Sequence, residues 1–183
     1  MDRMQIHPRP ALAGLLLAAS LATSAAAAQD NVPQIMQVPA DNSVAWRAPA
    51  EGVITYECRM IQTDGVRYAW VIAGASATLG AGQAGSSEPR GTYQSPPERW
   101  RAADGSTLTG METVRAYAGP ERLYDQLVLA NPSTGVGILT GVTYIQRLVR
   151  AGGGVPQTHC SSANKDQKTQ VAYQADYVFW KPN

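Results

Sequence analysis

The sequence has few of the residues on which catalytic and metal sites are most often built. Its 183 residues include only two histidines, two cysteines and one phenylalanine, and 15 basic residues nearly balance 14 acidic ones. A nucleic-acid-binding protein usually has a basic excess, so we expect no nucleic-acid partner. We also expect no metal site, because zinc takes three or four ligands, most often histidine and cysteine.

Long apolar runs are absent except near the N-terminus, where the pattern is that of a secretory signal peptide. A short basic start precedes an apolar run over 11–22, and Ala26-Ala27-Ala28 fits the A-x-A motif that signal peptidase cleaves. The alternative is an uncleaved anchor, since the run approaches the roughly 18 residues of a spanning helix. We favour cleavage, which makes residues 1–28 a signal peptide. The protein is then exported, periplasmic or secreted, with no membrane span after cleavage.

The two cysteines, Cys58 and Cys160, both follow this signal. An even number of cysteines in an exported chain predicts a disulfide, and the alternative is a pair of free buried thiols. In the chain-entropy model, a bridge that closes a loop of this length stabilises the fold by roughly 4–5 kcal/mol.

Short segments in which apolar and polar residues alternate predict an all-β fold. The segments 54–60 and 66–72 both alternate and are separated by a Thr-Asp-Gly turn, so they predict a hairpin whose apolar residues share one face. A second hairpin is predicted around the turn at 103–105. Residues 171–180 alternate as cleanly and predict a further half-buried strand.

Other segments are less regular. Residues 29–42 predict an extended N-terminal arm, and 74–97 are dense in glycine, serine and proline and predict a long irregular loop. Residues 120–130 fit either a short helix or a buried strand, and 138–150 are rich in strand-forming residues. The expected architecture is a single β domain over 43–183: a β-sandwich or an open barrel, with long loops and at most one short helix.

Three patterns suggest enzymes but lack the rest of the machinery. Residues 80–85 fit G-x-G-x-x-G, yet prolines follow where a dinucleotide-binding helix must begin, so we expect no cofactor. His159 has no G-x-S-x-G motif to accompany it and fits a loop histidine beside a disulfide. Glu57 and Asp176 would serve glycoside hydrolysis only if paired in space, and solvated strand faces suit them better. We therefore predict no catalytic residues.

Tyrosine and tryptophan are abundant by comparison, with eight and four copies. Their rings combine an apolar face with a polar group, which suits grooves for sugars and small molecules, although the same rings fill β cores. The candidate ligand-binding residues are Tyr56, Trp70, Trp100 and Tyr173. The leading hypothesis is a non-catalytic module that binds a small-molecule or carbohydrate ligand or a partner. A small hydrolase acting on a carbohydrate or ester and a structural envelope protein are the alternatives, and the oligomeric state is left open.

A set of motifs spread along the chain points to one protein family. They include GVITYEC (52–58), Trp100, GVGILTGVTYIQR (135–147) and VAYQADYVFW (171–180). In this order they resemble the family catalogued as domain of unknown function 3455. The resemblance implies an exported protein with its two cysteines paired, and it brings no established activity. Some fungal relatives carry a malate-dehydrogenase label, which the incomplete glycine motif does not support.

Overall fold

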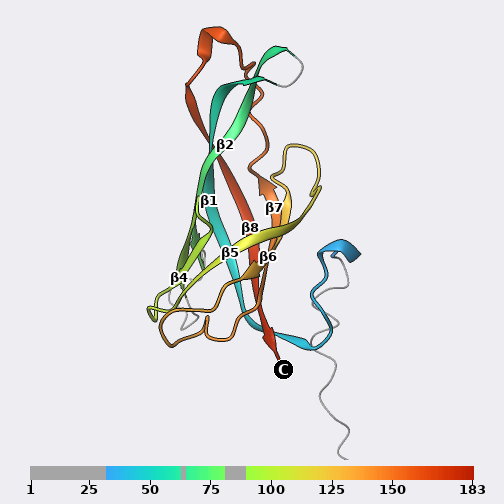
Figure 1. Cartoon of the computed structure of the whole chain (residues 1–183), viewed down its shortest axis with the longest axis vertical. Coiled ribbons are helices and arrows are strands. Elements are labelled where there is room, and N and C mark those ends of the chain that lie inside the picture. Colours follow the sequence, from blue (N-terminus) through green and yellow to red (C-terminus); the bar gives the residue numbers. More distant parts are fainter. Residues whose placement is uncertain (1–31, 63–64, 81–89) are drawn as a thin grey trace, which may run out of the picture.

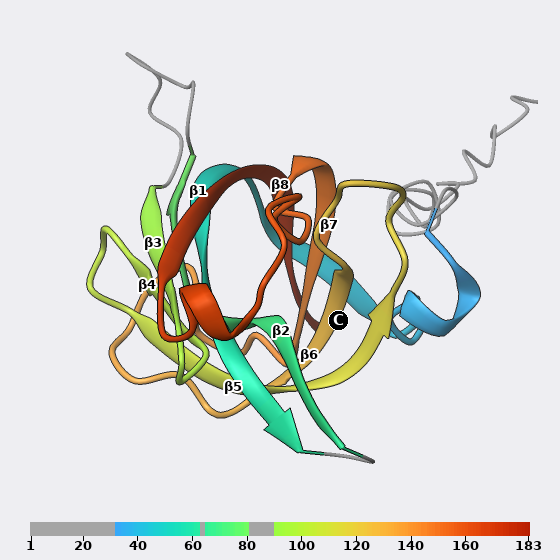
Figure 2. The ribbon, with the colours of Figure 1, turned by 90° about the horizontal axis from the view of Figure 1, so that it is seen from above.

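The computed structural model describes residues 32–62, 65–80 and 90–183, so the expected signal peptide lies outside the described residues. In this part of the chain, eight antiparallel strands form one sheet that closes into a barrel, with each strand paired to the next and β8 paired back to β1 (Figures 1 and 2). The strands are β1 (Asn42–Gln62), β2 (Val66–Leu79), β3 (Gly91–Ser95), β4 (Arg99–Ala102), β5 (Thr107–Ala116), β6 (Asp125–Ala130), β7 (Tyr144–Gly152) and β8 (Lys168–Pro182). The all-β class is confirmed, and the sheet forms a closed barrel where a β-sandwich or an open barrel was expected.

Both predicted hairpins are confirmed. In the first, Cys58 of β1 lies opposite Trp70 of β2, and in the second the turn around Asp104 joins β4 to β5. The first hairpin extends beyond the other strands (Figure 1). Met60 and Ile72 are therefore 44% and 46% exposed, and the apolar face that the alternation predicted is not buried at that end.

The loop predicted over 74–97 is wrong for much of its length. β2 continues to Leu79, and β3 begins at Gly91. Small residues made this region look irregular, but Ala77 and Leu79 alternate into the core, where larger side chains from other strands fill the space. Residues 81–89, which hold most of the glycine motif, lie outside the described residues. The ambiguous segment 120–130 contains strand β6 rather than a helix.

The barrel interior forms the main core. β8 shows the pattern most clearly: Tyr173, Ala175, Tyr177 and Phe179 point inward, as predicted. One end of the barrel is closed by the segment 131–143, whose apolar side chains join this core. The middle of β1 lies close to β2, and this requires glycine at position 52. A side-chain carbon there would collide with the carbonyl oxygen of Ser76.

The described part of the N-terminal arm, residues 32–41, lies outside the barrel, at the lower right of Figure 1. It contains the short 3-10 turn η1 (Gln34–Met36), and a second such turn, η2 (Ser162–Asn164), precedes β8. The arm covers apolar side chains that β6 and β8 point outward. This second core consists of Val32, Met36, Val38, Leu127, Val178 and Trp180. Among the described residues, no helix has the length and apolar character needed to cross a membrane.

The predicted disulfide is confirmed. Cys58, on the extension of β1, is bonded to Cys160 in the connection between β7 and β8. Backbone hydrogen bonds link the same two segments, from Cys58 N–H to Gln167 O (2.9 Å) and from Asp166 N–H to Cys58 O (2.8 Å). The connection is thus fixed to the β1–β2 hairpin at the end of the barrel that segment 131–143 leaves open.

Candidate functional site

A cavity of about 490 Å³ occupies the open end of the barrel. It is bordered by β1, β2, β3, β5, β6 and β7, by the turn between β3 and β4, and by the segments before β6 and after β7. Its wall combines aliphatic side chains, aromatic rings and a polar group of arginines, glutamates and one glutamine. The polar residues that line it are Ser95, Glu98, Glu112, Arg115, Arg122, Gln126 and Arg147.

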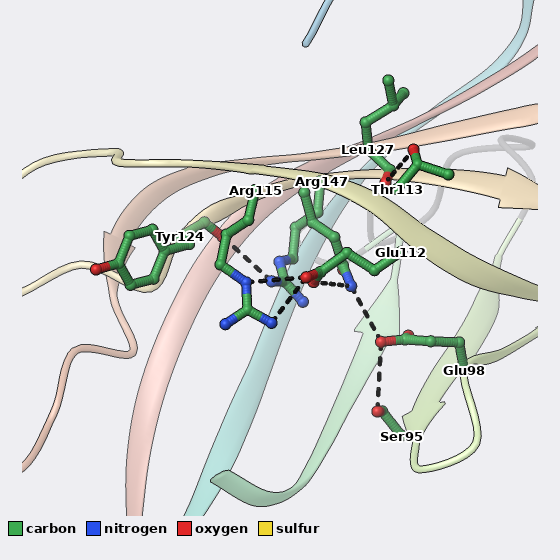
Figure 3. Close-up of polar contacts among 9 residues, drawn as sticks. Ser95, Glu98, Glu112, Thr113, Arg115, Tyr124, Leu127 and Arg147 are labelled. Carbon is green, nitrogen blue, oxygen red and sulfur yellow. Dashed lines mark hydrogen bonds and ion pairs between the residues drawn. The ribbon is translucent and has the colours of Figure 1, made fainter. Parts of the chain in front are cut away.

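Arg147 is the most deeply placed charge in this cavity. It lies on β7 between Ile145 and Val149, which both point into the core, and its side chain is only 6% exposed. Its Nη2 donates a hydrogen bond to the carbonyl oxygen of Tyr124 (3.1 Å; Figure 3). Within the described part of the chain, no carboxylate lies at ion-pair distance from its guanidinium.

Three buried tyrosines act on the guanidinium of Arg147, and one of them, Tyr93, lines the cavity. Burial opposes its charge, yet the pKa of Arg147 lies above its ordinary value because the hydroxyl oxygens of Tyr177, Tyr93 and Tyr173 are close. Burial likewise raises the pKa of each of these tyrosines, and the charge of Arg147 works in the opposite direction. All three hydroxyls are therefore protonated at neutral pH and can donate hydrogen bonds.

A second polar group centres on Gln126 of β6, which is 2% exposed. Its Nε2 donates hydrogen bonds to Glu98 Oε1 (3.1 Å) and to Glu112 Oε2 (2.8 Å). Glu98 also accepts a hydrogen bond from Ser95 Oγ (3.4 Å), and Glu112 forms an ion pair with Arg115 (2.8 Å; Figure 3). The side-chain nitrogen of Gln126 thus binds two carboxylates, one from the turn between β3 and β4 and one from β5.

Several polar atoms of the cavity have no hydrogen-bond partner among the described residues, although they are buried. They are Arg147 Nε, Gln126 Oε1 and Glu98 Oε2. A buried donor or acceptor without a partner costs about 1–3 kcal/mol, so native proteins rarely leave one unpaired without a functional reason. All three atoms belong to residues that line this one cavity.

Only two of the four residues predicted to bind a ligand lie at the cavity. Tyr56 and Trp70 line the cavity, and Trp100 and Tyr173 do not. Tyr56 donates to the carbonyl oxygen of Gly153 (2.7 Å), and Trp70 Nε1 donates to that of Thr158 (2.6 Å). Both rings therefore attach the disulfide-bonded connection to the rim.

The other two rings are buried in the core. Trp100 packs against Tyr93, with ring centroids 5.3 Å apart. Tyr173 shares a hydrogen bond with Tyr177 (3.0 Å) and also borders a separate outer groove near Gly152. Both lie on the inward face of their strands, as their alternation with neighbouring residues predicts.

The residues that sequence reasoning considered for catalysis lie elsewhere. His159 is exposed, Glu57 pairs with Arg59 (2.7 Å), and Asp176 lies 3.7 Å from Arg150. None of them lines the cavity. Among the described residues, no group of three His, Cys, Asp or Glu side chains is arranged to hold a metal ion.

Sequence reasoning missed the polar residues of the cavity, although a signal was present. Ile145, Arg147 and Val149 alternate along β7, so the arginine shares a face with two core residues. Gln126 and Val128 show the same relation on β6. A charged or amide side chain on the inward face of a barrel strand is rare unless it has a partner or a function.

Comparison with known proteins identifies a family for this chain but no individual relative. The model of one family, described as a protein of unknown function (DUF3455), matches residues 80–181, which is more than half of the chain. No curated protein and no solved structure matches the sequence. The matched segment includes Glu98, Glu112, Gln126 and Arg147.

Proposed function

Because this chain belongs to the family described as a protein of unknown function (DUF3455), which supplies no activity to carry over, we propose its function from the cavity itself. The protein is a non-catalytic binding module that holds a small organic molecule in the open end of its barrel. The carrying observation is the set of buried, unpartnered polar atoms of Arg147, Gln126 and Glu98 in one cavity.

The size and the lining of the cavity support this proposal. Sites for small molecules usually measure about 300–1,000 Å³ and combine apolar walls with a few convergent polar groups. Here Ile54, Leu123 and the rings of Tyr56 and Trp70 supply apolar surface beside the polar group around Arg147. The sequence-based hypothesis of a binding module therefore gains a specific location, which includes two of its four candidate residues.

Export of the protein belongs to the same proposal. The disulfide fits an oxidising compartment, where such bonds form and persist. It also fixes the connection that carries Thr158 and Val155 to the rim of the cavity. We therefore place the binding module in the periplasm or outside the cell, where reduction does not loosen its rim.

A thermal-shift screen of small organic molecules tests the proposal. A ligand present at about a hundred times its dissociation constant adds roughly 2.7 kcal/mol, or several degrees in Tm for a domain of this size. Ala75→Trp fills the cavity and should abolish every shift. Ala103→Trp, in the exposed turn at the opposite end, is the matched control and should retain them. A screen without hits, or hits that Ala75→Trp retains, would contradict the proposal.

One observation favours the hydrolase alternative. Glu98 and Glu112 both accept a hydrogen bond from the same nitrogen of Gln126, so their carboxyl groups lie close together, as the two carboxyl groups of a glycoside hydrolase do. Glu112 also forms an ion pair with Arg115. Turnover of chromogenic glycosides that both Glu98→Gln and Glu112→Gln abolish would support catalysis over simple binding.

A further inference from the structure

The charges in the cavity define the chemical class of its ligand. Resting on the proposed binding function, we infer that the ligand is an organic carboxylate, and that its carboxylate group is anchored by the buried guanidinium of Arg147. A hydroxyl or N–H group of the same molecule is bound by Glu98 and Gln126.

The charge of Arg147 has no carboxylate partner among the described residues. A buried charge is costly unless it is paired, and the carboxylates of Asp125, Glu112 and Glu98 are engaged elsewhere. Asp125 accepts a hydrogen bond from the backbone N–H of Val149 (2.6 Å) and acts on Arg147 only through its field. Glu112 is paired with Arg115, and Glu98 is bound by Gln126.

The guanidinium is also held ready for an acceptor. The carbonyl oxygen of Tyr124 fixes Nη2, and tyrosine hydroxyls surround the group, while the Nε–H has no partner among the described residues. A planar guanidinium with a free N–H matches a carboxylate better than a single acceptor atom, because two oxygens can be bound in one plane. The arginine needs little reorganisation when the ligand arrives.

The rest of the lining agrees with an anion that carries an apolar body. Three arginines and two glutamates border the cavity, which leaves an excess of positive charge to attract anions. Ile54, Ile72 and Val155, together with the ring of Trp70, provide apolar contact surface. A small inorganic anion would leave this surface uncovered.

The unpartnered acceptors restrict the ligand further. Glu98 Oε2 and Gln126 Oε1 have no donor at hydrogen-bond distance among the described residues, although the Tyr93 hydroxyl also acts on Glu98. A second carboxylate beside Glu98 would be repelled, whereas a hydroxyl or N–H group satisfies both acceptors. Monocarboxylates with such a donor therefore fit better than dicarboxylates.

The test compares a panel of hydroxylated aromatic and aliphatic carboxylates with their neutral carboxamides by calorimetric titration. In the wild-type protein the carboxylates should bind at least about tenfold more tightly. Arg147→Met should reduce this ratio to about one. Arg150→Met, on the same strand but exposed and paired with Asp176, is the control and should preserve the ratio.

Two results separate failure of this inference from failure of the binding function. If carboxamides or other neutral molecules bind the wild-type protein as tightly as carboxylates, and Ala75→Trp prevents their binding, the cavity is a binding site but the carboxylate assignment is wrong. If no molecule binds, both are wrong. The wild-type comparison decides this even if Arg147→Met does not fold.

Discussion

Gln146 shows how much a single side chain contributes at the interface between arm and barrel. It lies on the outward face of β7 and is fully buried, because the arm covers it. Its Nε2 donates to the carbonyl oxygen of Met36 (2.6 Å), and its Oε1 accepts from Trp180 Nε1 (2.8 Å). The amide thus satisfies one buried acceptor and one buried donor from segments far apart in the sequence.

Replacing this amide tests that bond pair. Gln146→Leu keeps the volume but leaves both partners unsatisfied, so we expect the free energy of unfolding to fall by about 3 kcal/mol in urea titrations. Gln170→Leu, at an exposed position of β8, should change it by less than about 0.5 kcal/mol. Equal stabilities of the two variants would show that the arm is not held in this way.

Asp104 links the turn between β4 and β5 to the segment that closes the barrel. Its carboxylate accepts hydrogen bonds from the backbone N–H groups of Ser106 (2.9 Å) and Ile138 (2.7 Å) and from the Ser106 hydroxyl (2.6 Å). The Ser106 hydroxyl first, and then the two N–H groups, lower the pKa of Asp104. The ionised form is therefore the one that the fold stabilises.

The pH dependence follows from this direction. Because the pKa of Asp104 is lower in the folded protein than in the unfolded one, its ionised form stabilises the fold. This contribution is full above the pKa in the unfolded chain, about 3.9, and is lost as the pH falls through the pKa in the folded protein. At neutral pH, Asp104→Asn should therefore cost about 1 kcal/mol in urea unfolding. In acid, below the folded pKa, the wild-type protein and the variant should converge. A difference that stays constant with pH would exclude this role of the carboxylate.

At the scale of elements, the N-terminal arm offers a matched pair of neighbours. Met36 is fully buried against the outer face of the barrel, whereas Ile35 is 64% exposed. Met36→Ala should lower the free energy of unfolding by about 2–5 kcal/mol, and Ile35→Ala by no more than about 0.5 kcal/mol. Thermal or urea unfolding measures both, and similar small effects would mean that the arm does not dock in solution.

The disulfide joins two elements that both border the cavity. Replacing Cys58 and Cys160 together by alanine should lower the free energy of unfolding by about 4–5 kcal/mol in the chain-entropy model. Because the connection after β7 carries Val155 and the acceptor of Trp70, ligand affinity should fall as well. Unchanged stability and affinity in the double variant would contradict both roles.

At the scale of the whole molecule, local patterns predicted most strands but not how they close. Alternation identified β8 and both hairpins because each strand has one buried face. The pairing of β1 with β8, which closes the barrel, joins residues far apart in the chain and leaves no local pattern. The alanine- and glycine-rich end of β2 was missed because small residues have a weak preference for strands.

The candidate site depends on that closure, and this explains why only part of it was predicted. Tyr56 and Trp70 were predicted because they are aromatic residues on strands in which apolar and polar residues alternate. Glu98, Gln126 and Arg147 come together only when the turn between β3 and β4 lies with β6 and β7 around one barrel. The inward position of Arg147 was readable from its neighbours, but its lack of an ion-pair partner was not, because that depends on where every carboxylate of the folded chain lies.

The most direct test of the binding function is to follow the side-chain N–H signals of the arginines by nuclear magnetic resonance while a screening hit is titrated. We expect the Nε–H signal of Arg147 to shift strongly and to exchange more slowly with water once its free donor is satisfied. The signal of Arg150, on the exposed face of the same strand, should not move. A ligand that binds tightly while the Arg147 signal stays in place would contradict the assignment of this cavity as the binding site.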